Sequence, residues 1–189
     1  HYRIIPHKAF VSRWTPVDNC VHLPIIHNCD NSVYWGDKQG TIGYDSSDIS
    51  HTYTGDYTDT VNSVVALGDL SGWNIIHNVP DVESNATLNE IVHMGTLKPA
   101  DLSGAWRDAS LMVWTAVDGP SLEDITTMRS WFQNCTSFDG SLGSWKTQNV
   151  TDMSATFKFC TSFNNDGLNS WNVSNVQNMC EMFFEETAK

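Results

Sequence analysis

The sequence is poor in basic residues. Ten lysines and arginines stand against 22 aspartates and glutamates, which gives a net charge of −12. A protein that binds nucleic acid needs a basic face to neutralise phosphates, and attraction to anionic lipid needs the same kind of charge. The composition therefore argues against both classes of partner. We expect no nucleic-acid partner and no direct membrane insertion.

Long apolar runs are missing as well. No 18 consecutive apolar residues occur, so the sequence predicts no transmembrane helix. It also lacks a recognisable signal peptide. The chain starts at His1 rather than at a methionine and stops within a repeated pattern at Lys189, so we expect a processed or partial chain.

The common catalytic motifs do not occur either. There is no Gly-x-Ser-x-Gly elbow, P-loop, His-Glu-x-x-His pair or dinucleotide fingerprint. Carboxylates are so abundant that no glycosidase-like pair can be singled out. We predict a protein without enzymatic activity, catalytic residues or a cofactor. The alternative, a secreted hydrolase with ancillary repeats, would need a catalytic domain outside this sequence.

What the chain does have is enough apolar material for a core. Hydrophobic residues make up 40% of it, and eight of its residues are tryptophan. Charged residues are few, whereas Ser, Thr, Asn and Asp are common, which is typical of strands and turns rather than of a helical bundle. We expect a folded, mainly β protein.

The C-terminal half repeats itself. "NCTSFDGSLGSW" (134–145) returns as "FCTSFNNDGLNSW" (159–171), and the surrounding apolar residues recur every 25 or 26 residues. A degenerate earlier copy places Leu102, Trp106 and Ala109 one repeat before Met128, Phe132 and Cys135. Repeats of this length are typical of solenoids, in which each coil buries its apolar side chains against the next. The predicted repeat core comprises Ile125, Met128, Phe132, Cys135, Phe138, Leu142, Trp145, Val150, Met153, Phe157, Cys160, Phe163, Leu168, Trp171, Val176, Met179 and Phe183.

Spacing within one repeat suggests its local structure. Met153, Phe157 and Cys160 stand at i, i+4 and i+7, which predicts a short helix capped by Thr151. The alternation in "SWNVSNV" (170–176) predicts a short extended segment. Each repeat is therefore expected to form one coil containing a helical turn and a strand-like segment.

Two sets of cysteines call for interpretation, and the total of five argues against a complete internal disulfide framework. Cys135 and Cys160 share a repeat position and could form a disulfide or metal site. Because Ala109 fills the same position without sulfur, small buried apolar residues are the favoured interpretation.

The other set lies in "CVHLPIIHNC", where Cys20, His22, His27 and Cys29 are all competent zinc ligands. A turn would have to bring the two pairs together, but "LPII" favours a strand. A metal site, a Cys20–Cys29 disulfide and unpaired residues all stay open, and we favour the last. We therefore predict no metal.

The first third has a different pattern. Short runs rich in Val, Ile, Tyr and Thr, separated by turn residues, predict a β-sandwich. These runs are 10–14, 20–26, 31–37, 50–61 and 63–67. A polar segment with Pro80 (77–90) predicts a linker. We therefore expect a sandwich over 1–80 and a repeat solenoid over 81–189.

Four asparagines stand in the glycosylation acceptor pattern, namely Asn85, Asn134, Asn149 and Asn172. Three of them fall at recurring polar turns of the repeat. Repetition of turn residues therefore explains them without any modification.

The repeat "NVTDMSATFKFCTSFNNDGLNSWNVSNVQNM" (149–179) resembles that of BspA-like bacterial surface proteins and mycoplasma lipoproteins, which has the form W-x-[VT]-S-x-V-x-x-M-x-x-x-F-x-x-C-x-x-F-N. The upstream "FVSRW", "LPII", "VYWGD" and "HTYTGDYTDTV" are similar to the polycystic-kidney-disease type of immunoglobulin-like module that precedes such repeats. "LNEIVHMGTLKPADLSGAW" (88–106) resembles the junction. The module usually reads Gly-Asp-Gly, but Asp37 is followed here by Lys38, and Cys180 and Met182 depart from the repeat.

The resemblance implies a leucine-rich-repeat-like solenoid displayed on a surface for adhesion. Its partner would be a protein or glycan, and its location extracellular, on a cell surface or on a virion. The alternative is a structural component of a phage or viral capsid or tail, which contacts sibling subunits or a host surface. The resemblance fixes no binding residues.

Overall fold

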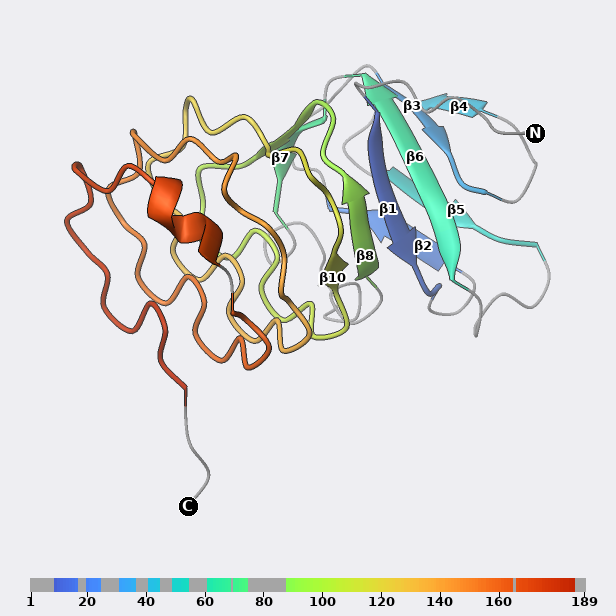
Figure 1. The fold of residues 1–189 in the computed structure, drawn as a ribbon. Helices are drawn as coiled ribbons and strands as arrows, with labels where there is room; N and C mark the ends of the chain where they lie inside the picture. The colour runs from blue at the N-terminus through green and yellow to red at the C-terminus, as the bar shows by residue number, and fades with distance from the viewer. Residues whose placement is uncertain are drawn as a thin grey trace.

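The computed structural model describes residues 9–16, 20–24, 31–36, 41–44, 49–54, 61–68, 70–74, 88–164 and 166–185. Within these ranges the protein is mainly β, as expected, and the one helical element is a short 3₁₀ helix, η1 (Asp166–Ser170). The sheets gather at one end of the molecule, and stacked irregular coils form the other (Figure 1).

The largest sheet has six strands in the order β10-β8-β1-β6-β3-β4. All its pairings are antiparallel except that of β10 with β8. Its strands are β1 (Phe10–Trp14), β3 (Asn31–Tyr34), β4 (Thr41–Tyr44), β6 (Asn62–Gly68), β8 (Leu88–His93) and β10 (Val113–Trp114). The strand-rich pattern of the first third predicted β1, β3 and β6 but not β4.

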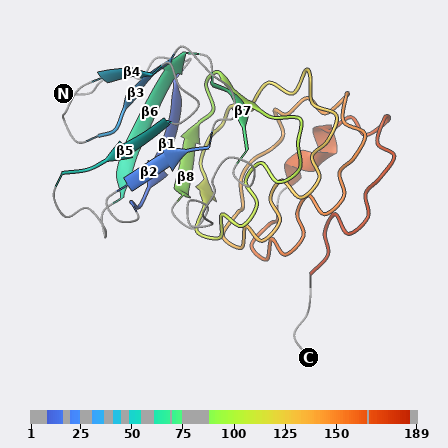
Figure 2. The ribbon, with the colours of Figure 1, turned by 180° about the vertical axis from the view of Figure 1, so that it is seen from behind.

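Two small sheets complete the β structure. β2 (Cys20–Leu23) pairs antiparallel with β5 (Ile49–Thr52), and the two lie in front of the six-stranded sheet when the molecule is seen from behind (Figure 2). β2 ends before Pro24, which has no N–H to continue the ladder. β7 (Leu70–Trp73) pairs parallel with β9 (Leu97–Pro99).

Buried aromatic side chains pack within the sheet-bearing part. Trp14, Trp35 and Trp73 are fully buried. Trp35 stacks on His51 at 5.2 Å, and the Tyr53 hydroxyl donates to the Trp35 carbonyl over 2.8 Å. Aromatic residues thus account for much of the core of this part, as their number in the sequence suggested.

The sheets continue past the predicted module boundary at residue 80. β8, β9 and β10 all follow that residue, yet β8 pairs with β1, β9 pairs with β7, and β10 joins the same large sheet through β8. Residues 88–90, which were assigned to the end of a linker, belong to β8 instead, because Leu88 is buried and pairs with Trp14. Residues 77–87 and Asp37 lie outside the described residues.

The coils are held together by backbone hydrogen bonds between residues one repeat apart. Met128 N–H donates to Asp152 O over 2.8 Å, and Met153 N–H donates to Asn178 O over 2.8 Å. Isolated parallel bridges join Thr127 to Asp152 and Asp152 to Asn178. The coils consequently stack in succession away from the sheets, as the ribbon shows (Figure 1).

The short helix predicted after Thr151 is wrong. Thr156 N–H bonds to Met153 O, three residues back, but Phe157 N–H bonds to Met182 O in the next coil. In an α-helix every N–H would bond four residues back. Thr151 does not cap a helix; its N–H and its hydroxyl both donate to Thr126 O. The extended segment predicted over 170–176 is also not a strand.

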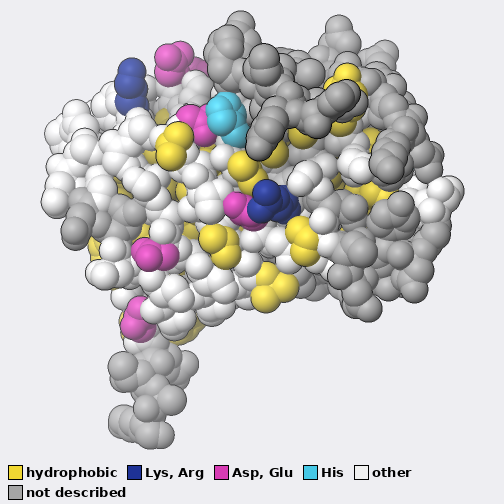
Figure 3. Space-filling model, turned by 45° about the vertical axis from the view of Figure 1, so that its right-hand side comes forward, with side chains coloured by type: hydrophobic (Ala, Val, Ile, Leu, Met, Phe, Trp, Pro, Cys, Tyr) yellow, Lys and Arg dark blue, Asp and Glu magenta, His cyan; other side chains and the backbone are white. Residues whose placement is uncertain are grey.

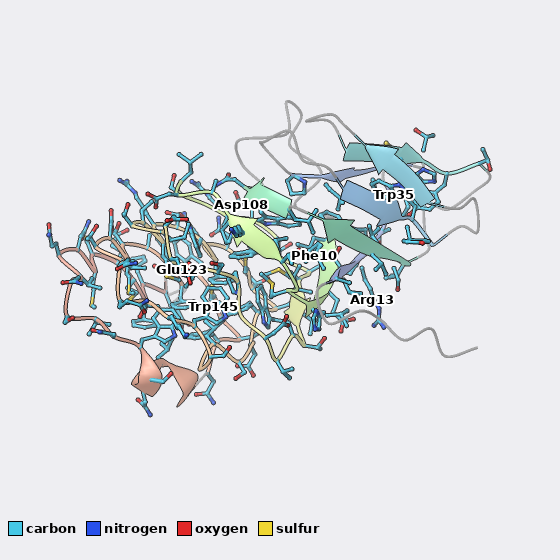
Figure 4. The ribbon with its side chains drawn as sticks, turned by 90° about the horizontal axis from the view of Figure 1, so that it is seen from above. Phe10, Arg13, Trp35, Asp108, Glu123 and Trp145 are labelled. Atoms are coloured by element: carbon cyan, nitrogen blue, oxygen red, sulfur yellow. The ribbon has the colours of Figure 1, made fainter. Side chains whose placement is uncertain are left out.

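Aromatic side chains at equivalent positions stack from coil to coil. Phe132 lies parallel to Trp106 at 5.1 Å and to Phe157 at 5.5 Å, and Phe157 lies parallel to Phe183 at 5.6 Å. The view from above places Trp145 among the coils, apart from Phe10 and Trp35 in the sheets (Figure 4). Trp73 contacts Trp106 at 6.4 Å, so one continuous core joins both parts.

The predicted repeat core falls into three groups. Phe163, Leu168 and Val176 are partly buried against the core, and Met179 and Phe183 are 45% and 55% exposed. The prediction is wrong for these last two, because no described coil covers the outer side of the coil that carries them. The buried members are Ile125, Met128, Phe132, Cys135, Phe138, Leu142, Trp145, Val150, Met153, Phe157, Cys160 and Trp171.

A seven-residue segment of the first coil was missed by sequence reasoning. Over 111–117 burial alternates: Met112, Trp114 and Ala116 are buried, whereas Val113 and Val117 are exposed. This period of two is the signature of a strand, and part of the segment forms β10 beside β8. Hydrophobic side chains are scattered over one face of the molecule, with acidic and basic side chains between them (Figure 3). No helix among the described residues is long and apolar enough to span a membrane.

The aromatic column gives a matched test of the packing. Phe157→Ala should lower the free energy of unfolding by about 3–5 kcal/mol, because it removes a buried ring between two others. Phe183→Ala, at the exposed end of the same column, should cost less than about 1 kcal/mol. Urea denaturation followed by tryptophan fluorescence measures both, and equal costs would contradict the arrangement.

Candidate functional site

The first three coils each contain two residues in the left-handed region, and the last coil contains one. Gly104, Ser130, Ala155 and Glu181 occupy the first position with φ of 79°, 55°, 53° and 56°, respectively. Asp108, Asn134 and Phe159 occupy the second with φ of 65°, 64° and 61°, respectively. The spacing between equivalents is again 25 or 26 residues. The repeat is therefore a repeat of backbone conformation as well as of side chains.

The left-handed residues produce the alternating hydrogen bonds. Lys158 N–H closes a turn on Ala155 O, and Phe159 N–H then donates to Phe184 O in the next coil over 2.9 Å. A residue other than glycine pays about 1–2 kcal/mol for this conformation. The repeated ladder bonds offset that cost, so the backbone is held in a shape that the residues alone would not choose.

These turns project a set of side chains outward, which we call the turn face. Asn134 donates from its side-chain amide to the Asp108 carboxylate, and Arg107 Nε lies 3.3 Å from the same carboxylate. All of these side chains are partly or fully exposed. The turn face consists of Arg107, Asp108, Gln133, Asn134, Lys158, Phe159, Glu181 and Phe184.

The third and fourth coils add an aromatic and cationic cluster to the turn face. The Lys158 ammonium lies 2.6 Å from Glu181 Oε2 and 5.2 Å and 5.1 Å from the ring centroids of Phe159 and Phe184. The two rings meet edge to face at 5.7 Å. Phe159 shares its left-handed conformation with the equivalent Asp108 and Asn134, so the repeated backbone fixes where its ring lies.

Equivalent positions of the turn face carry different residue types in successive coils, whereas interior positions carry the same types. Interior positions carry Met128 and Met153, or Cys135 and Cys160. In contrast, Asp108, Asn134 and Phe159 occupy one turn-face position in successive coils. A constant backbone therefore displays side chains of different chemistry at regular intervals.

Many other polar side chains are used to hold the coils. The Asp101 carboxylate accepts from the N–H groups of Thr126 and Thr127. Asn149, one of the glycosylation-pattern asparagines, donates its side-chain amide to Glu123 O over 2.7 Å, and Asn172 accepts from Ser174 N–H. These polar residues therefore have a structural role. Asn85 lies outside the described residues.

Asp118 is a further polar group that sequence reasoning missed. Its carboxylate accepts from the N–H groups of Met94 and Gly95 over 2.8–3.1 Å, and it lies 3.4 Å from His93 Nδ1. His93 Nδ1 is also 2.7 Å from Ala9 O. The loop of the first coil is thereby fastened to the turn between β8 and β9.

The buried cysteines act as small donors within the stack. The Cys135 thiol lies 3.0 Å from Trp106 O, and the Cys160 thiol lies 2.8 Å from Phe132 O. Both cysteines, like exposed Cys180, are free thiols. Burial raises the pKa of Cys135, and it raises the pKa of Cys160 to about 12. The thiols of the unfolded chain ionise at a lower pH than those of the folded protein. The buried thiols therefore contribute fully to the free energy of unfolding below about pH 9, and this contribution is lost as the pH rises further.

The "CVHLPIIHNC" hypotheses are only partly covered. Cys20 is in β2, and Thr52 Oγ1 lies 3.8 Å from its sulfur. His27 and Cys29 lie outside the described residues, as does the side chain of His22, so the metal site and the disulfide stay predictions. Among the described residues, no three His, Cys, Asp or Glu side chains gather as metal ligands.

Substitutions at Ala155 test the left-handed turns. Ala155→Gly should leave the free energy of unfolding unchanged or raise it by up to about 1 kcal/mol, because glycine adopts positive φ without steric cost. Ala155→Val should lower it by about 1–3 kcal/mol, since a β-branched residue resists this conformation. As a control, Lys146→Gly, at an exposed position without positive φ, should be mildly destabilising. Denaturant titration of the three variants decides the matter; a stabilising Ala155→Val would contradict it.

Thiol reactivity tests the burial of the cysteine column. In the native protein at about pH 8, iodoacetamide should label Cys180 and spare Cys135 and Cys160, because only an accessible thiolate reacts. Unfolding in guanidinium should expose all three to labelling. Peptide mass spectrometry reads the modified positions, and native labelling of Cys160 at the rate of Cys180 would be inconsistent with the packing.

Comparison with known proteins gives one result. Residues 100–188 match a family described as "Mycoplasma protein of unknown function, DUF285". No curated protein and no solved structure matches the chain. The match covers the coils and leaves the sheet-bearing residues before residue 100 unmatched.

Proposed function

We propose that this chain is a non-enzymatic binding protein displayed on a surface, which uses the turn face of a leucine-rich-repeat-like solenoid to contact a protein or a glycan. In this proposal the sheets form an immunoglobulin-like β-sandwich that carries the solenoid. The parallel bridges through Thr127, Asp152 and Asn178 and the stacked aromatic column support the solenoid. The β2–β5 sheet lying over the six-stranded sheet supports the sandwich.

The observation that carries the proposal is the variation on the turn face. The stack holds its backbone rigidly at positive φ and displays Asp108, Asn134 and Phe159 in sequence along one column. A rigid scaffold that presents different side chains at fixed intervals suits recognition of a large, extended partner.

The side chains of the turn face indicate which kinds of partner it can bind. A partly exposed aromatic pair beside a lysine offers apolar contact area, while the amides and carboxylates of Gln133, Asn134 and Asp108 offer hydrogen bonds. Aromatic anchors surrounded by polar groups are common in interfaces with proteins. The net charge of −12 disfavours polyanions, so nucleic acid is not the expected partner.

A substitution that copies residues from one coil to the next tests this proposal. The double variant Lys158→Gln with Phe159→Asn gives the third coil the residues that Gln133 and Asn134 place in the second, so the backbone can accept it. Fluorescent beads coated with the purified chain should adhere to an epithelial cell layer, and the double variant should reduce adherence at least about tenfold, as loss of a hot spot does.

The control is Lys146→Asn, which copies Asn172 onto the equivalent exposed position away from the turn face. It should adhere like the unchanged chain. Equal loss in both variants, or no adherence at all, would contradict the proposal. A symmetric particle of many copies in light scattering would instead favour the structural virion component.

A further inference from the structure

Lys158 lies among the side chains of Phe159, Phe184 and Glu181. Its ammonium is 5.2 Å and 5.1 Å from the two ring centroids and 2.6 Å from Glu181 Oε2. The rings themselves meet edge to face at 5.7 Å. Aromatic rings and a carboxylate are the groups that attract an organic cation. We call Phe159, Glu181 and Phe184 the cation cage, and Lys158 is the cation that it holds in the free chain.

The backbone ladder fixes the cation cage between the third and fourth coils. Phe159 N–H donates to Phe184 O, and Ala155 N–H donates to the carbonyl of the residue before Glu181, both over 2.9 Å. Phe159 and Glu181 are also held in the left-handed region, with φ of 61° and 56°, respectively. Because the backbone sets the separation of these residues before a partner arrives, the entropic cost of binding is lowered.

Lys158 satisfies the cation cage only in part. Among the residues that the structure describes, its ammonium donates to Glu181 Oε2, whereas Glu181 Oε1 accepts no hydrogen bond. The Glu181 side chain is 48% exposed, and Phe184 is 45% exposed. Ion pairs and cation–π contacts at such sites are weak, and lysine has a flexible stem. Lys158 can therefore leave the cage for water at small cost.

The charge around the cation cage favours a further cation. Glu185, which follows Phe184, is exposed and makes no ion pair with any described residue. Two carboxylates, those of Glu181 and Glu185, thus stand against the single ammonium of Lys158. The whole chain carries a net charge of −12, so its field attracts basic groups and repels acidic ones.

We infer that the cation cage binds an arginine side chain of a protein partner, which replaces Lys158; this inference rests on the proposed function of the turn face. A guanidinium is a planar fork that donates to both oxygens of one carboxylate and stacks on aromatic rings. It therefore uses Glu181 Oε1, which the ammonium of Lys158 leaves without a donor. The partner is a protein with exposed arginine, because a neutral glycan offers no cation.

A blocked tripeptide, Gly-Arg-Gly with an acetylated N-terminus and an amidated C-terminus, tests the cage directly. Titrated into the isotopically labelled full chain, it should shift the ring resonances of Phe159 and Phe184 in NMR spectra, with a Kd below about 10 mM. The same tripeptide with citrulline, which has the shape of arginine without its charge, should cause no saturable shift. The tripeptide with lysine should bind more weakly than that with arginine.

Removing the resident cation should improve binding. Lys158→Gln copies Gln133 from the preceding coil, and it should lower the Kd for the arginine tripeptide at least about fivefold, because the cage is then always free. Lys146→Gln removes the same charge at an exposed position away from the cage, and it should leave the Kd unchanged. Adding Phe159→Asn to Lys158→Gln should raise the Kd at least about tenfold, since one ring is lost.

Three results would each overturn the inference. They are no saturable shift with the arginine tripeptide, equal binding of the arginine and citrulline tripeptides, and an equal effect of Lys158→Gln and Lys146→Gln. Adherence of coated beads reports separately on the proposed function. Probe binding without adherence would contradict the proposed function and leave the cage in place, whereas adherence without probe binding would contradict the cage alone.

Discussion

The rest of the molecule depends on the hydrogen bonds between coils. In the turn segments, every second N–H group donates to a carbonyl of the next coil. These hydrogen bonds occur together with two left-handed residues in each of the first three coils, where this conformation turns the intervening N–H back onto its own segment. The same bonds set the coils at a regular separation, so side chains at equivalent positions meet face to face. The stacked rings of Trp106, Phe132 and Phe157 are therefore a result of the backbone ladder.

The ladder also divides the work of the polar residues. Side chains such as Asp101 and Asn149 satisfy backbone groups at the edges of the coils, where an unpaired amide or carbonyl would be costly. The side chains of the turn face satisfy fewer of the backbone groups. Lys158 and Phe159 contact each other and the next coil from outside, which leaves their identity open to selection for contact with a partner.

Sequence alone predicted the period, the mainly β class and most buried positions, because burial imposes the same residue type on each coil. It did not predict the local backbone. Met153, Phe157 and Cys160 have the spacing of a helix face, but left-handed turns at Ala155 and Phe159 direct them inward instead. Alanine and phenylalanine give no signal of positive φ; the signal lay one or two coils earlier, in Gly104, Asp108 and Asn134.

The sequence pattern also did not predict that apolar side chains of the last coil are exposed. Met179 and Phe183 look like their buried equivalents in the sequence, and only the position of the surrounding coils shows that they are open. The contacts of Trp73 and Asn74 were equally hidden, since nothing in the first third marks them as donors to the repeat.

The hydrogen bonds of Trp73 and Asn74 affect the position of all the coils. Their two donors meet Ser103 O and Ala105 O, and this allows the first coil to settle on the sheets in a single alignment. The later coils keep their register to one another through their own hydrogen bonds, so this junction sets where the whole stack lies against the sheets. A slip of one residue at the junction would leave both carbonyls without their donors and shift the stack relative to the sheets.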